Sequence, residues 1–141
     1  MSKSFYKMYA QEHFAVVKFA PGIFTLEEAK RINHEYKADP EYYKIHYLVI
    51  ILSDCIPNFT TKELPEIADI YSKAYQTNNH VNTAWVVDEP IATAFTHLFI
   101  HTTPENSEYC STLEKAYLHL GLNMTYDNFI ELIKKSIAEN E

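Results

Sequence analysis

The sequence predicts an α/β fold with one mixed, mostly parallel sheet and helices packed on it. Three observations lead to this fold class. Two short aromatic or β-branched segments open the chain at 4–10 and 13–19, an unbroken apolar segment follows at 47–52, and later apolar segments alternate with helical patterns. The expected order is ββαβαβαα when the helix at 91–99 and the weak strand at 108–110 are not counted, and strands that are joined through helices run parallel.

The first two strands are expected to form an antiparallel hairpin. Segments 4–10 and 13–19 are separated by only two polar residues, which favours a tight connection. The Pro-Gly pair at 21–22 then ends the second strand.

A capped helix is predicted at 26–37. Thr25 and Glu28 have the spacing of a capping box, in which the hydroxyl accepts a main-chain N–H and the carboxylate reaches back. The apolar residues that follow have helical spacing, and the Asp39-Pro40 pair ends the helix.

The segment 47–52 predicts a central strand covered on both faces, because it is apolar at every position and short. A strand at 81–87 and a short, weaker one at 108–110 complete the predicted sheet. Helical apolar stripes predict four further helices at about 64–75, 91–99, 113–120 and 126–138.

Local residues predict where two of these helices begin or end. Asp88 is expected to cap the helix at 91–99, because a proline follows two residues later. Ser111 and Glu114 form a second capping box, and Gly121 suits the left-handed position that ends a helix.

Length and composition favour one cytosolic domain over residues 1–141. The chain has 141 residues, 47% of them hydrophobic and 22% charged, which is ordinary for a globular protein. The net charge of −7 disfavours binding to nucleic acid or to an anionic membrane surface. The segment 47–52 is far too short to span a bilayer, and two cysteines make no disulfide framework.

Four phrases follow one another along the chain: FAPGIFTLEEAKRI, YLVIILSD, AWVVDEPIATAFTHLF and EYCSTLEKAYLHLG. In this order they resemble the STAS-like domains, the fold of anti-sigma-factor antagonists, and in particular the small bacterial STAS-like proteins of unassigned function. The resemblance covers about residues 4–121, and the helix at about 126–138 lies beyond it. It implies a cytoplasmic regulatory or binding domain that acts through a protein partner at the loop end of the sheet, without enzymatic activity.

Regulatory members of that family carry a phosphorylated serine in an Asp-Ser-Ser-Gly-like context after the central strand. This chain departs from the pattern, because the corresponding loop is longer and no glycine follows a serine. The hydroxyls nearest to the expected position are Ser53, Thr60 and Thr61. A phosphate on one of them would add charge at a helix start and change the affinity for a partner.

Asp54 and Asp88 are the first candidate site residues. Each follows a predicted parallel strand, and open α/β sheets bind ligands at that end. If the two strands are neighbours, the carboxylates could lie close together. The alternative is structural: Asp54 makes a turn and Asp88 caps a helix.

Aromatic residues flank the central strand and form the second candidate group. Tyr42, Tyr43, Tyr47 and Phe59 combine apolar rings with polar tips, which suits a pocket rim or a protein interface. Ordinary packing is the alternative.

Other chemistry-bearing residues support no cofactor or metal. His97 and His101 have zinc-compatible spacing without a third ligand, and the two glycines of the chain cannot build a phosphate-binding loop. Cys55 follows Asp54, which would raise the pKa of its thiol, and Cys110 is expected in the core.

Three functions remain open. The first is the regulatory or binding module, the second a carrier of a small apolar ligand in a pocket lined by Tyr and Phe, and the third an enzyme using Asp54 and Asp88. A homodimer through the opening hairpin or the last helix is also considered.

Overall fold

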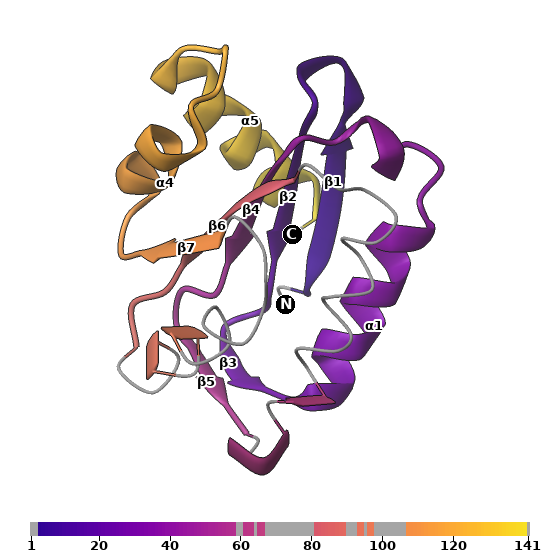
Figure 1. Cartoon of the computed structure of the whole chain (residues 1–141), viewed down its shortest axis with the longest axis vertical. Coiled ribbons are helices and arrows are strands. Elements are labelled where there is room, and N and C mark those ends of the chain that lie inside the picture. Colours follow the sequence, from indigo (N-terminus) through magenta and orange to yellow (C-terminus); the bar gives the residue numbers. More distant parts are fainter. Residues whose placement is uncertain are drawn as a thin grey trace.

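The computed structural model describes residues 3–58, 61–63, 65–66, 81–89, 93–94, 96–97 and 107–140. Figure 1 shows a sheet with helices on both sides. The strands are β1 Phe5–Tyr9, β2 Phe14–Lys18, β3 Gly22–Phe24, β4 Tyr47–Ile51, β5 Cys55–Pro57, β6 Asn82–Val86 and β7 Ser107–Cys110. The α-helices are α1 Leu26–Ala38, α4 Leu113–Leu120 and α5 Tyr126–Glu139, and 3-10 turns lie at Ala10–Glu12, Tyr42–Lys44 and Thr61–Glu63.

Five strands form the main sheet in the order β1-β2-β4-β6-β7. β1 pairs with β2 antiparallel, and the other three pairings are parallel. Val49 of β4 lies between Val16 of β2 and Ala84 of β6. The predicted α/β class, the hairpin and the mixed sheet are therefore confirmed.

Two apolar cores cover the two faces of this sheet. α1 packs Ala29, Ile32 and Tyr36 onto one face, while α4 and α5 cover the other. Successive residues of β4 alternate between the cores, because side chains of a strand point to opposite faces. All four residues of β4 after Tyr47 are buried, so the prediction of a doubly covered strand is confirmed.

A second, two-stranded sheet continues the chain beyond β2 and β4. β3 pairs with β5 in parallel, with Ile23 opposite Ile56, and Gly22 N–H donates to Asp54 O at 2.9 Å. The two strands lie at the end of the sheet opposite the turn that joins β1 to β2 (Figure 1). The sequence predicts a turn and a loop here instead of strands, because three residues are too few to show strand periodicity.

The helix caps are confirmed in part. Thr25 Oγ1 accepts from Glu28 N–H at 3.2 Å, as expected. The Glu28 carboxylate, however, accepts hydrogen bonds from the Ser4 hydroxyl and from Arg31, and these hold the pKa of Glu28 below its usual value. α4 is capped by Thr112, one residue later than predicted, because it is the Thr112 hydroxyl that accepts from Lys115 N–H.

The last part of the chain follows the prediction closely. Gly121 ends α4 with φ +64°, and Thr125 caps α5, whose Phe129 and Ile133 are buried. Among the described residues, no helix is long and apolar enough to cross a membrane.

Two predicted helices fall largely outside the described residues. Of the helix predicted at 64–75 the structure describes 65–66, and of the one at 91–99 it describes 93–94 and 96–97; all of these are helical.

Candidate functional site

The carboxyl ends of β4 and β6 meet at one edge of the sheet. Leu52 N–H donates to Val86 O at 2.8 Å, so the segments that leave the two strands start side by side. Because Asp54 and Asp88 each lie two or three residues beyond their strand, the parallel pairing brings them together.

A hydrogen bond joins these two segments. Asp54 N–H donates to Asp88 Oδ1 at 2.9 Å, and Asp54 adopts a left-handed conformation with φ +61°. Aspartate tolerates this conformation better than most residues. The Asp88 carboxylate thus accepts from the neighbouring loop. The main-chain oxygen of Glu89 accepts from Thr93 N–H, four residues later. Glu89 therefore takes the capping position that the sequence predicts for Asp88.

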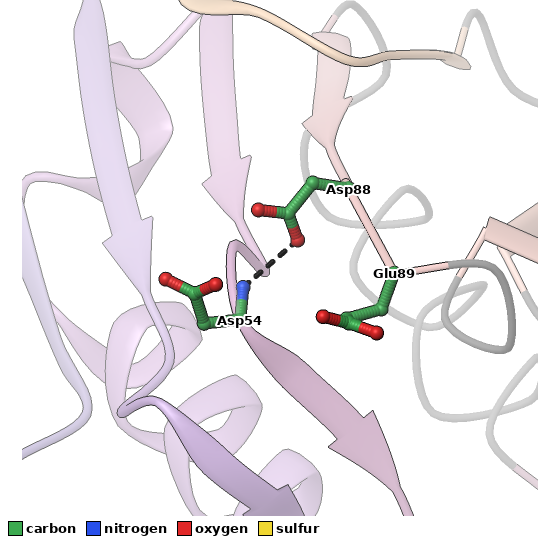
Figure 2. Close-up of side chains that lie close together, drawn as sticks. All are labelled: Asp54, Asp88 and Glu89. Atoms are coloured by element: carbon green, nitrogen blue, oxygen red, sulfur yellow. Dashed lines mark hydrogen bonds between the residues drawn. The ribbon is translucent and has the colours of Figure 1, made fainter.

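Glu89 adds a third carboxylate to this edge. Figure 2 shows it extending from the segment after β6 toward Asp54 and Asp88. One carboxylate oxygen from each of these residues lies within 4.8 Å of the others, and we call the three residues the acidic cluster. Asp54 and Asp88 are exposed and Glu89 is half-buried.

The acidic cluster can attract cations or basic side chains. Exposed carboxylates gather on many proteins without binding a metal. We therefore interpret the acidic cluster as a negatively charged surface and assign no metal site to it. The proximity that the enzyme hypothesis requires is present, but both aspartates are exposed. The enzyme hypothesis therefore stays a prediction.

Cys55 lies directly beneath this edge. Its side chain is fully buried, and its thiol donates to Ala20 O at 3.3 Å. Burial raises the pKa of Cys55 to about 11; Lys18 opposes this shift, and Asp88 and Asp54 add to it. The predicted direction is thus correct, although burial is the main cause. A thiol that holds its proton so tightly is a poor nucleophile.

Sequence analysis missed the pair formed by Ile23 and Ile56, which we call the Ile23–Ile56 pair. These residues are opposite each other in the β3–β5 register, and their side chains are 72% and 46% exposed. Their neighbours Phe24 and Cys55 face inward and are buried. The only signal in the sequence is an isoleucine in each of two segments between predicted elements, and the strand pairing is needed to show that the two are neighbours.

The predicted hydroxyls are only partly described. Ser53 is half-buried, and its carbonyl oxygen accepts from the Cys55 thiol at 3.6 Å. Thr61 begins a 3-10 turn. Phe59 and Thr60 lie outside the described residues.

The predicted tyrosines lie at the opposite end of the sheet. Tyr42 and Tyr43 precede β4, whereas Asp54 follows it. Tyr42 is buried and packs against Tyr36 with ring centroids 5.7 Å apart. Tyr43 is exposed, with the Lys44 ammonium over its ring. The structure therefore does not join them to the acidic cluster, and the carrier hypothesis stays a prediction.

The remaining candidates that lie within the described residues have structural partners. His97 Nδ1 lies 2.9 Å from the Tyr109 hydroxyl, and His101 is outside the described residues. Cys110 is partly buried against the core beneath α4 and α5.

Comparison with protein-family models and with curated proteins finds no match for this chain.

Proposed function

We propose that this chain is a non-enzymatic binding module of the STAS-like type, which docks a protein partner at the carboxyl end of its sheet. The observation that supports it is the Ile23–Ile56 pair. The outward face of a half-buried ribbon normally has polar side chains, because it faces water. Here the outward position of both strands is a large apolar residue.

The shape of this surface suits a protein better than a small molecule. Small ligands bind in concave pockets that enclose most of their surface. Ile23 and Ile56 instead protrude from adjacent strands, so a partner must bring a complementary apolar surface to them. The proposed site keeps Ser53, Asp54 and Asp88 from the sequence analysis and adds Ile23, Ile56 and Glu89.

Comparative capture tests this function. The wild-type protein, Ile23→Ser and Leu118→Ser are immobilised and exposed to lysate of cells that make the protein. Leu118 on α4 is a matched control, because its side chain is 70% exposed, almost as much as that of Ile23.

The proposal predicts a protein that is retained by the wild type and by Leu118→Ser and is lost with Ile23→Ser. It fails if the three forms retain the same proteins. Circular dichroism melts confirm that each variant is folded, which is expected because both positions are on the surface.

A further inference from the structure

The surroundings of the Ile23–Ile56 pair define the chemistry of its partner, an inference that rests on the proposed function. Neighbouring strands lie about 4.8 Å apart, so the two isoleucine side chains form one continuous apolar strip. An extended peptide places residues i and i+2 on one face, about 7 Å apart. Two apolar side chains with this spacing can lie along the strip.

Negative charge borders the strip. Asp54 is two residues before Ile56, and its carbonyl oxygen accepts from Gly22, the residue before Ile23. Asp54 in turn bonds to Asp88, and Glu89 completes the cluster. The apolar strip, Asp54 and Asp88 therefore belong to one hydrogen-bonded unit, and the Glu89 carboxylate has an oxygen within 4.8 Å of both aspartates.

Lys18 is a cation that acts on the same region, since its charge opposes that of Asp54 and Asp88 at the Cys55 thiol. Within the part of the chain that the structure describes, the three carboxylates of the acidic cluster outweigh this ammonium, and the net charge of the chain is −7. A partner approaching the strip therefore meets an attractive field only if its own charge is positive.

We propose that the occupant of the Ile23–Ile56 pair is a protein segment with two apolar side chains flanked by lysine or arginine. The apolar side chains contact the isoleucines, and the basic side chains pair with Asp54, Asp88 and Glu89. Charge sets the specificity and the association rate, while the apolar contact slows dissociation.

Peptide probes test this assignment by fluorescence anisotropy with the full-length protein. The first probe is a labelled peptide with two isoleucines at i and i+2 flanked by lysines. The second has glutamates in place of the lysines, and the third keeps the lysines but has glycines in place of the isoleucines.

The first probe is expected to bind at least about tenfold more tightly than the glutamate-flanked probe, because three exposed ion pairs together supply about that factor. It should also bind at least about tenfold more tightly than the glycine probe, because that probe has no isoleucine side chains to bury against the pair. Its affinity should fall about tenfold in the Asp54→Asn/Asp88→Asn/Glu89→Gln variant, and also as salt rises and screens the charges. Ile23→Ser should abolish binding, and Leu118→Ser should not change it.

Two results overturn the assignment: the lysine-flanked probe binds no better than the glutamate-flanked one, or it binds no better than the glycine probe. These failures are distinct from failure of the proposed function. That function is lost only if the captured proteins do not depend on Ile23, whatever the charge of the partner.

Discussion

Asp54 N–H donates a 2.9 Å hydrogen bond to Oδ1 of Asp88, 34 residues further along the chain. This bond links the loop after β4 to the segment after β6, and Gly22 N–H bonds to the carbonyl oxygen of the same Asp54. Asp54 thus connects the β3–β5 ribbon to the main sheet. The exposed isoleucines lie on the ribbon that this connection helps to hold, together with the β3–β5 pairing and the buried Phe24 and Cys55.

Removal of the Asp88 carboxylate should loosen the connection. Asp88→Ala leaves Asp54 N–H without its acceptor, and we expect the free energy of unfolding to fall by about 1 kcal/mol, since the bond is at the surface. Asp88→Asn keeps an oxygen acceptor and should lose less than half of that. Urea unfolding measures the free energy of unfolding of both variants. The same free energy for Asp88→Ala and the wild type would contradict the role given to this bond.

Cys55 should make the stability depend on pH in the alkaline range. Its pKa is about 11 in the folded chain and 9.0 without burial, so the unfolded chain loses this proton first. The contribution of the protonated thiol to the free energy of unfolding is fully present below pH 9.0. It is lost as the pH rises toward about 11. Urea unfolding across this window should show a smaller fall for Cys55→Ala than for the wild type.

The same thiol should be protected from reagents. In the native protein at pH 8, a thiol-specific reagent should modify Cys110, which is partly exposed, well before Cys55. Mass spectrometry of the labelled peptides identifies the modified residue. Equal labelling of the two cysteines would contradict the buried position of Cys55.

Tyr6 should be among the last tyrosines to ionise. Burial, together with the 2.9 Å hydrogen bond that its hydroxyl donates to Asp39, raises the pKa of Tyr6 from 10.0 to about 12. In an ultraviolet titration, Tyr6→Phe should remove absorbance change near pH 12 and leave the change near pH 10 intact. The lost bond should also cost about 1 kcal/mol of stability. Loss of the change near pH 10 instead would contradict this contact.

α5 should belong to the cooperative unit, although it lies beyond the resemblance to STAS-like domains. Phe129 is fully buried, and its ring lies 5.6 Å from that of Phe14 in β2. Phe129→Ala should therefore lower the free energy of unfolding by about 3–5 kcal/mol in a single transition. Leu118→Ser, on the surface of α4, should change it by less than about 0.5 kcal/mol. A separate early transition of α5 in Phe129→Ala would show that the helix is not part of the core.

The sequence predicted the elements that have long local patterns. The apolar segment of β4, the capped stripe of α1 and the hairpin spacing each contain enough residues to show a period. Thr112 replaced Ser111 as the cap of α4 because adjacent hydroxyls offer two starting points, and packing decides between them.

The candidate site was predictable only in part. Asp54 and Asp88 could be placed at one edge because parallel strands end together. β3 and β5 could not be found, because each has three residues and exists only through pairing between segments 33 residues apart. The Ile23–Ile56 pair depends on that pairing. Tyr42 and Tyr43 are close to Asp54 along the chain. They precede β4, however, whereas Asp54 follows it, so the length of this strand separates them in space.

Site-specific photo-crosslinking in cells that make the protein tests the binding surface most directly. A photo-reactive side chain is placed at position 23, 56 or 118 in turn. We expect the same covalent partner from positions 23 and 56 and none of it from position 118. A partner that crosslinks equally from all three positions, or no partner at 23 and 56, would contradict binding at the Ile23–Ile56 pair.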